Sequence, residues 1–267
     1  MDHSFTERRK HGQKFPNVLW IVRHGESAGN VARELAEAAG HVYIDIPGDV
    51  KRDVDVPLSE LGCGQAAALG RWYGAMGAEE KPTVVLTSPY SRARKTATII
   101  LETAGIESGD VSFVVDERLR EKEFGILDRL TTFGIKERFP DQHELRTALG
   151  KFYFRPPGGE SWCDVILRLR SIIDTLTREH RQENVLIVAH QVVVNCFRYL
   201  FERMTEGEIL AVDRQADVPN CSVTSYRFDP TLGRKGKLAL DLVNFVAPLE
   251  DTGTPVTTKP DVPVMPK

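Results

Sequence analysis

The residues with the clearest chemistry follow an apolar run near the start of the chain. Residues 18–30 read VLWIVRHGESAGN, so an apolar stretch leads directly into Arg23 and His24. Such a run is typical of a buried strand, and open α/β sheets bind their ligands outside the carboxyl ends of the strands. Gly25 lets the backbone approach a bound group closely. An imidazole and a guanidinium beside a helix start form a suitable site for an anionic group.

A second cluster of this kind follows a second apolar run. Residues 84–97 read VVLTSPYSRARKTA, and we expect Ser91 to cap a helix whose first turn contains Arg92. A second guanidinium and the free N–H groups of a helix start therefore lie beyond the end of a strand. Arg94 and Lys95, by contrast, fit the solvated face of that helix.

An acidic group that could transfer a proton lies in a third segment. Residues 116–125 read DERLREKEFG, in which carboxylates alternate with cations just after another predicted strand. A carboxyl group can serve as proton donor in a reaction that expels an alkoxide, because an unprotonated alkoxide is a poor leaving group. Composition alone does not separate Glu121 from Glu117 or Glu123 as that donor.

A histidine stands at the end of a fourth apolar run. Residues 185–191 read VLIVAHQ, which predicts a buried strand that carries His190 at its carboxyl end. Because the carboxyl ends of parallel strands meet at one edge of a sheet, we expect His190 to face the same crevice as the first cluster.

Together these segments resemble the histidine phosphatase superfamily, also called the phosphoglycerate mutase-like family, whose signature is an apolar strand followed by Arg-His-Gly. The match continues here through Ser27 and Asn30. The family pattern Ser-Pro-x-x-Arg-Ala-x-x-Thr-Ala places its phosphate-binding arginine at Arg92. The pattern Leu-x-Glu-x-x-(aromatic)-Gly places its general acid at Glu121. The resemblance implies that His24 becomes transiently phosphorylated.

The fourth segment departs from the usual His-Gly of the family because Gln191 follows His190. The fructose-2,6-bisphosphatase branch of the family has the same His-Gln pair, so the resemblance still assigns His190 to the site. We expect the Gln191 amide to lie near the substrate. The other residues that we expect to bind substrate are Ser27, Asn30 and Arg155, of which Arg155 is suited to a second anionic group.

The combined set is sufficient for phosphoryl transfer without a metal ion or another cofactor. Neutral His24 would attack phosphorus in line, while Arg23, Arg92 and His190 stabilise the charge on the phosphoryl oxygens. Glu121 would protonate the leaving oxygen and then act as base for the water that hydrolyses the phosphohistidine. We therefore expect a phosphatase that hydrolyses a small phosphorylated metabolite.

Three other functions remain open. A mutase of this family would return the phosphoryl group to its bound product, but the family's mutases carry tryptophan-rich residues where this chain has Ala28 and Gly29. A member of the family without catalytic activity is disfavoured because every catalytic position holds a competent residue. A metal-dependent phosphatase could use Asp53 and Asp55, yet no apolar strand leads into that segment, which we interpret as a loop.

Apolar and polar patterning places these motifs in an α/β fold, a three-layer α/β/α sandwich with a mostly parallel central sheet. The predicted strands are 18–22, 84–87, 112–115, 185–189, 222–228 and 238–245, the last two as a hairpin at the edge of the sheet. The predicted helices are 26–39, 59–76, 91–104, 161–180 and 192–204. Residues 31–54 are expected to form a lid or rim over the site.

Composition indicates a single large domain. The chain has 267 residues, of which 41% are hydrophobic and 27% charged, with a net charge of −3. This balance argues against binding to nucleic acid or to an anionic membrane surface. The four cysteines are widely spaced, without metal-binding pairs. We expect a cytoplasmic protein and leave a homodimer open.

The ends of the chain differ from its centre. Residues 1–16 are polar and lack the apolar segment of a secretory signal, so we expect a flexible segment there. Residues 17–247 are expected to form the histidine phosphatase domain. Residues 248–267 are rich in proline and threonine and poor in large apolar groups, which predicts a disordered tail.

Overall fold

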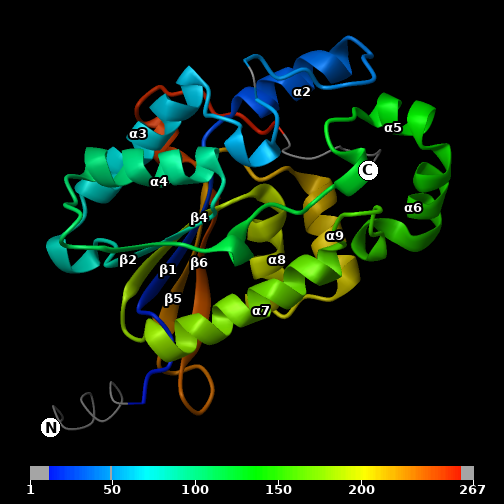
Figure 1. Cartoon of the computed structure of the whole chain (residues 1–267). Helices are drawn as coiled ribbons and strands as arrows, with labels where there is room; N and C mark the ends of the chain where they lie inside the picture. Colours follow the sequence, from blue (N-terminus) through cyan, green and yellow to red (C-terminus); the bar gives the residue numbers. More distant parts are fainter. Residues whose placement is uncertain (1–11, 49, 260–267) are drawn as a thin grey trace, which may run out of the picture.

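The computed structural model describes residues 12–48 and 50–259, and its strands form one mixed sheet (Figure 1). The strand order is β3-β2-β4-β1-β5-β6. Neighbours from β3 to β1 pair in parallel, whereas β5 runs antiparallel to both β1 and β6. The strands are β1 (Val18–Arg23), β2 (Val84–Thr87), β3 (Ser112–Val115), β4 (Asn184–Ala189), β5 (Val223–Asp229) and β6 (Lys237–Phe245).

Helices cover both faces of this sheet, which confirms the predicted α/β/α sandwich (Figure 1). One face carries α3, α4 and α10, and the other carries α7, α8 and α9. The helices of the described chain are α2 (Ala28–Ala38), α3 (Glu60–Gly74), α4 (Ser91–Ala104), α5 (Thr132–Arg138), α6 (Pro140–Tyr153), α7 (Trp162–Glu179), α8 (Gln191–Phe201), α9 (Glu206–Gln215) and α10 (Ala247–Glu250). None of these helices combines the length and the apolar character that crossing a bilayer requires.

The burial of β1 explains why its sequence is apolar throughout. Leu19 and Ile21 pack with α7 and α8 on one face, whereas Trp20 and Val22 pack with α3 and α4 on the other. Successive side chains of a strand point to opposite faces, so a strand between two helical layers must be apolar at every position. The strand that leads to the first motif is therefore rigidly held.

Several local expectations differ from the structure. The expected hairpin at the edge of the sheet is confirmed, with β6 as its outer strand and β5 paired to β1. Helix α4 is capped at Tyr90 without a side-chain hydrogen bond, so the prediction that Ser91 is the cap is wrong. Helices α5, α6, α9 and α10 were not predicted. Helix α6 is weakly amphipathic and interrupted at Gly150, where φ is 78°, so its apolar periodicity is poor.

The tail expected to be disordered is packed along the domain as far as residue 259. Leu249 of α10 is buried in the core cluster formed with α3. The Gln65 side chain donates hydrogen bonds to the carbonyl of Pro255 and to the hydroxyl of Thr257, at 2.9 and 3.0 Å. Residues 260–267 and 1–11 of the two predicted terminal segments lie outside the described residues, while Gln13 is buried.

Helix α3 approaches the loop after β1 so closely that two glycines are required. A Cβ atom at Gly62 would lie 2.0 Å from the carbonyl oxygen of Glu26, and one at Gly25 would lie 2.4 Å from the carbonyl oxygen of Gly62. Both contacts involve backbone atoms, and displacing these atoms would cost free energy of folding. This contact fixes the position of the residues that follow β1.

We therefore expect Gly62→Ala to lower the free energy of unfolding by about 1–3 kcal/mol, because overpacking displaces the backbone. Urea unfolding followed by circular dichroism measures the change. Gly64→Ala in the same helix is the matched control, since a Cβ there meets nothing within 4 Å. That control is expected to be stabilising by up to about 1 kcal/mol. Equal effects at the two positions would show that the close approach carries no cost.

Candidate active site

The central strands β1 and β4 bring two histidines together at the carboxyl edge of the sheet. The backbone N–H of His24 donates to the carbonyl of Ala189 at 2.9 Å, which continues the parallel pairing beyond β1. The His24 and His190 rings consequently lie edge to face, with centroids 5.1 Å apart. Both side chains are fully buried. The sheet alone therefore accounts for the juxtaposition of these two residues.

The hydrogen bonds of His24 define which ring nitrogen faces the cluster. Its Nδ1 lies 2.6 Å from the carbonyl oxygen of Gly25, and its Nε2 lies 3.2 Å from Nε of Arg92. A carbonyl accepts only and a guanidinium N–H donates only, so Nδ1 carries the proton and Nε2 carries the lone pair. The ring thus presents a nucleophilic nitrogen toward an arginine.

Arg92 is held in the first turn of α4 with its guanidinium buried. It also donates to the carbonyl and the carboxylate of Asp53, at distances of 2.8 to 3.1 Å. Its guanidinium carbon lies 4.8 Å from the centre of the Tyr90 ring. Asp53 begins a short 3-10 turn, so the segment that was interpreted as a loop forms a rim that covers Arg92. The other carboxylate of the DxD pair, Asp55, binds Arg52 instead.

His190 is oriented by the loop after β2. Its Nε2 lies 2.7 Å from the hydroxyl oxygen of Ser88, and the Tyr90 ring packs against it at a centroid distance of 5.0 Å. Both partners belong to the segment that also carries Arg92. Arg92 and His190 are therefore both positioned by the turn after β2.

Arg23 and Asn30 share a partner from the end of the described chain. Both donate to the carbonyl oxygen of Lys259, and Arg23 also donates to the carbonyl of Val218 at 2.5 Å. Asn30 and Ser27 form a capping box at the start of α2. Ser27 therefore has a defined structural role, and its predicted contact with substrate stays a prediction.

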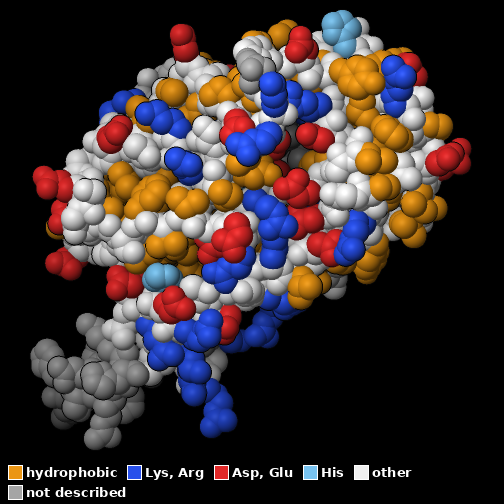
Figure 2. All heavy atoms as spheres, in the orientation of Figure 1, with side chains coloured by type: hydrophobic (Ala, Val, Ile, Leu, Met, Phe, Trp, Pro, Cys, Tyr) orange, Lys and Arg blue, Asp and Glu red, His pale blue; other side chains and the backbone are white. Residues whose placement is uncertain are grey.

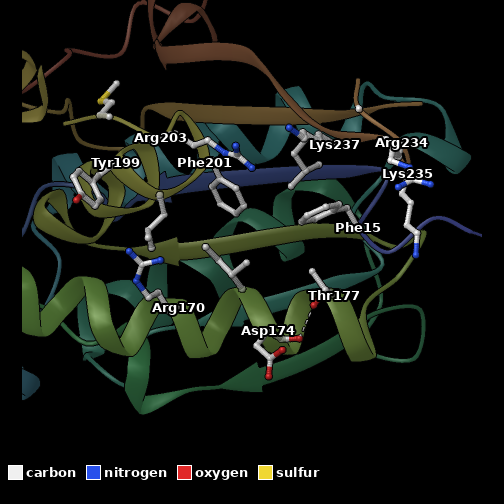
Figure 3. Close-up of a pocket in the computed structure, with 16 residues that line it drawn as sticks. Phe15, Arg170, Asp174, Thr177, Tyr199, Phe201, Arg203, Arg234, Lys235 and Lys237 are labelled. Atoms are coloured by element: carbon white, nitrogen blue, oxygen red, sulfur yellow. Dashed lines mark hydrogen bonds between the residues drawn. The ribbon is translucent and has the colours of Figure 1, made fainter. Parts of the chain in front are cut away.

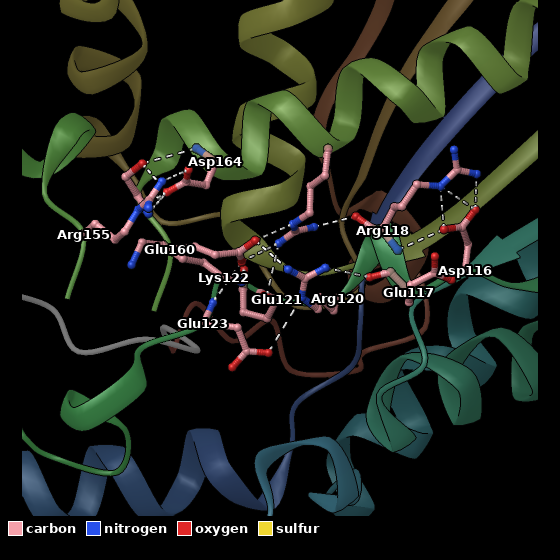
Figure 4. A network of polar contacts seen from close by, with 12 residues as sticks. Asp116, Glu117, Arg118, Arg120, Glu121, Lys122, Glu123, Arg155, Glu160 and Asp164 are labelled. Atoms are coloured by element: carbon pink, nitrogen blue, oxygen red, sulfur yellow. Dashed lines mark hydrogen bonds and ion pairs between the residues drawn. The ribbon is translucent and has the colours of Figure 1, made fainter. Parts of the chain in front are cut away.

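Figure 4 shows the polar contacts that the charged side chains of the segment after β3 make. Asp116 binds Arg118 at 2.6 Å, and Glu123 accepts from the Tyr90 hydroxyl at 3.0 Å. Glu121 is different, because its side chain is 2% exposed and one of its oxygens accepts from the backbone N–H of Lys122 at 2.7 Å. Glu121 also lines a cavity together with Arg92. Burial and position thus separate Glu121 from its neighbours.

Lys122 is an unusual neighbour for that carboxyl group because it too is buried. Its ammonium lies 4.1 Å from the centre of the Phe124 ring. Burial, with a further contribution from Arg146, lowers the pKa of Lys122 to about 8. Between pH 8 and 10.5 the unfolded chain therefore holds more protons than the native one, so this group makes the protein more stable as pH rises through that window.

We expect Lys122→Met to raise the free energy of unfolding at pH 7 by about 1–3 kcal/mol, because the cost of burying an ammonium group disappears. Urea titrations at pH 7 and pH 10 measure the change, and the difference between variant and wild type should shrink at the higher pH. Lys95→Met, at an exposed position of α4, serves as control and should change stability at pH 7 by less than about 0.5 kcal/mol. A variant less stable than wild type at pH 7 would contradict the argument.

Two predicted substrate-binding residues are engaged by neighbouring carboxylates. Arg155 forms a two-pronged ion pair with Asp164 at the start of α7, and its side chain is 62% exposed (Figure 4). Gln191 is buried in the first turn of α8 and donates to the carboxylate of Asp217 at 2.9 Å. Neither residue lines the cavity that contains Arg92 and Glu121. Arg23, His24 and His190 do not line it either, so the contacts of Arg155 and Gln191 with substrate stay predictions.

Other residues of that cavity were missed by the sequence analysis. Arg33, Asp53 and Arg129 line it, around a volume of about 30 Å³. Arg33 lies three positions after Asn30 in α2 and therefore on the same face of the helix, a signal that could have identified it. No pattern in the sequence indicated Arg129, because its position in the cavity depends on an unusual backbone angle.

A much larger groove lies elsewhere in the described chain. It occupies about 1400 Å³ between α7, α8 and the β5–β6 loop (Figure 3). Figure 2 shows a group of basic side chains at that lower end of the molecule. Phe15 lines the groove and precedes β1, so the groove lies at the opposite end of that strand from His24. It contains none of the predicted site residues.

Comparison with known proteins decides the family. The profile described as histidine phosphatase superfamily (branch 1) matches residues 19–239. The chain belongs to this superfamily. The resemblance inferred from the four motifs is therefore confirmed. The match includes all of the predicted catalytic residues, although it does not by itself test their roles.

Curated members of the histidine phosphatase superfamily that resemble this chain include both phosphatases and mutases. A 2,3-bisphosphoglycerate-dependent phosphoglycerate mutase of Methylorubrum extorquens is 32% identical over 84% of this chain and 97% of its own. The fructose-2,6-bisphosphatase of Saccharomyces cerevisiae is 30% identical over 72% of this chain. That alignment spans about a third of the yeast protein, 36% of its length.

Solved structures of histidine phosphatase fold agree with the architecture. Bacillus stearothermophilus YhfR superposes with a TM-score of 0.67 and 24% identity, over 87% of this chain and 98% of that one. A mycobacterial glucosyl-3-phosphoglycerate phosphatase in complex with VO3 gives a TM-score of 0.64 at 24% identity, over 86% and 100% of the two chains. At this level of identity the likeness establishes the fold alone.

Proposed function

We propose that this protein hydrolyses a phosphomonoester of a small metabolite through a phosphohistidine intermediate on His24. The observation that carries the proposal is the buried imidazole whose Nε2 lone pair lies 3.2 Å from the Arg92 guanidinium. A nucleophile and a phosphate-binding cation are thereby held side by side before substrate arrives. Membership of a superfamily that contains phosphatases and mutases supports this assignment.

The first step transfers the phosphoryl group to the enzyme. Nε2 of His24 forms a bond to phosphorus while the bond from phosphorus to the ester oxygen breaks. Arg23, Arg92 and His190 stabilise the negative charge on the three phosphoryl oxygens, which is the work that a metal ion performs in other phosphatases. Glu121 gives its proton to the departing oxygen, so the product leaves as a neutral alcohol.

The second step returns the enzyme to its initial state. Glu121, now ionised, removes a proton from a water molecule as its oxygen attacks phosphorus. The bond between His24 and phosphorus breaks, and inorganic phosphate is released. The proton that Glu121 lost in the first step is regained in the second. No redox agent or further reactant enters this cycle.

Substrate binding requires groups of the chain to leave the phosphate-binding donors. Asp53 occupies the outer nitrogens of Arg92, and the Lys259 carbonyl occupies Arg23 and Asn30. A phosphate dianion carries more negative charge than a carbonyl oxygen and can replace both partners. We therefore infer that the rim around Asp53 moves when substrate binds.

A mutase is the second candidate, because the Methylorubrum extorquens mutase aligns with this chain over 97% of its length. The two reactions differ in the acceptor of the phosphoryl group. A phosphatase passes it to water, whereas the mutase alternative passes it back to a bound product. Conversion of 3-phosphoglycerate to 2-phosphoglycerate, dependent on a bisphosphorylated primer and faster than phosphate release, would favour the mutase.

Turnover of p-nitrophenyl phosphate in excess chelator tests the proposal. We expect release of inorganic phosphate that is unchanged by added EDTA. Acid-labile, base-stable phosphate should appear on the protein after rapid quenching with a labelled substrate. A strict requirement for an added divalent metal ion would refute the mechanism. Turnover without labelled protein would refute the intermediate.

A further inference from the structure

Arg129 has an unusual backbone and an unsatisfied side chain. Its φ is 56°, in the left-handed region that residues other than glycine rarely adopt. Its Nε and Nη2 atoms are buried without a hydrogen-bond partner among the described residues. A positive φ and unpaired buried N–H groups both cost folding free energy. Features of this kind persist where the surrounding structure imposes them, often at functional sites.

The surroundings of Arg129 explain how this conformation is held. Its carbonyl accepts from the backbone N–H of Ile44 at 2.8 Å, and the next residue, Leu130, forms an isolated bridge with Tyr43. Thr131 adds a backbone hydrogen bond to the carbonyl of Val42 at 3.1 Å. The rim segment and the segment after Glu121 are thus tied together, with Arg129 fixed at their junction.

The guanidinium of Arg129 lines the same cavity as Arg92 and Glu121. Arg33, which is 7% exposed, lines it as well. Of the acidic groups there, Asp53 is engaged by Arg92, and Asp128 faces Arg33 and Arg129. Burial and the proximity of Asp53 raise the pKa of Asp128. Despite the proximity of Asp128, no hydrogen bond reaches Nε or Nη2 of Arg129 from the described residues, so these two groups retain capacity for an anion.

We propose that Arg129 is a specificity-determining residue that binds a second anionic group of the substrate, a carboxylate or phosphate, beside the phosphoryl group held at His24. Its two orphaned N–H groups match the paired oxygens of such a group. The inference rests on the proposed function, since it places the phosphoryl group at His24. It also gives rim residues 43 and 44 a part in substrate specificity, because they help to fix the position of Arg129.

Matched substrates test this proposal. Glycerol 3-phosphate and 3-phosphoglycerate differ in one carboxylate, so the ratio of their kcat/KM values reports the second subsite. We expect wild type to favour 3-phosphoglycerate and Arg129→Gly to lower that preference at least about 10-fold, mainly through KM. Glycine suits a φ of 56°, so this variant should fold, and its thermal midpoint checks that point. Arg129→Lys, which keeps the charge but loses the planar fork, should retain part of the preference.

Arg155→Ala is the comparison variant, since Arg155 is the arginine that the sequence suggested for this purpose. We expect it to leave the substrate preference unchanged, because its guanidinium is engaged by Asp164 at an exposed position. A preference that is lost in Arg155→Ala and kept in Arg129→Gly overturns the proposal. Equal losses for both substrates in Arg129→Gly overturn it as well.

A binding measurement separates this proposal from the catalytic one. If wild type turns over neither substrate, calorimetric binding of 2,3-bisphosphoglycerate decides the role of Arg129, and the proposed function itself fails only if p-nitrophenyl phosphate is not hydrolysed either. Binding weakened at least about 10-fold in Arg129→Gly supports the second subsite. Equal affinity in the two proteins, or no binding by wild type, overturns it.

Discussion

Replacing His24 by alanine is expected to lower kcat for p-nitrophenyl phosphate by about 10⁴-fold or more. The variant lacks the only atom that the mechanism uses to form a bond to phosphorus, and loss of a nucleophile typically removes most of an enzyme's rate enhancement. Release of nitrophenol in the presence of EDTA measures the effect. The quenched variant should also carry no acid-labile phosphate.

His41→Ala is the control for this experiment. The His41 side chain is exposed, whereas its backbone N–H donates to the carbonyl of Ala36 and its carbonyl accepts from the Thr131 hydroxyl. It should retain wild-type turnover within about twofold. Residual activity of His24→Ala within 100-fold of wild type would indicate that another group is the nucleophile, and His190 would be the next residue to test.

Glu121→Gln is expected to change the kinetics in a manner that depends on the leaving group. For an alkyl phosphate such as glycerol 3-phosphate, kcat/KM should fall by about 10²–10⁴-fold, because the departing alkoxide receives no proton. For p-nitrophenyl phosphate the first step should remain fast, since nitrophenolate leaves without protonation. The second step still needs a base, so rapid mixing should show a burst of one nitrophenol per active site.

Glu123→Gln provides the matched control, two residues away in the same segment. Glu123 is bound by the Tyr90 hydroxyl and lies near Arg120, and 46% of its side chain is exposed. No burst and no dependence on the leaving group are expected for this variant. If Glu123→Gln shows the burst and Glu121→Gln does not, the two carboxylates have been assigned in the wrong order.

The strands of this protein follow directly from its apolar runs. The predicted strands at 84–87 and 112–115 coincide with β2 and β3, and the others differ by one residue at one end or, for β5, at both ends. Strands such as β1 and β4, which are buried between two helical layers, appear as apolar runs, so their limits are visible in the sequence. The same logic brought His24 and His190 to one edge, since β1 and β4 are parallel neighbours.

Helices outside the two layers that cover the sheet were harder to predict from the sequence. Helix α5 is absent from the two core clusters that cover the sheet, and α6 joins one of them through Phe152; the predicted helices included neither. The segment at 248–259 also appeared disordered by composition, yet it packs along α3 through Leu249 and the Gln65 side chain. Polar contacts of this kind depend on partners distant in sequence, which composition does not reveal.

By itself, the sequence determined the sheet, its motifs and the chemistry that a histidine, two arginines and a carboxylate can perform, and the family pattern within it pointed to Glu121. Tertiary structure alone buried Glu121 among more exposed acidic neighbours, turned Arg155 outward and placed Arg129 in the cavity. The physical reason is that motif positions depend on local patterns of burial, whereas these choices depend on contacts between segments far apart in the chain. A left-handed arginine at residue 129 cannot be foreseen from its neighbours, because the pairing of this segment with residues 42–44 holds it there.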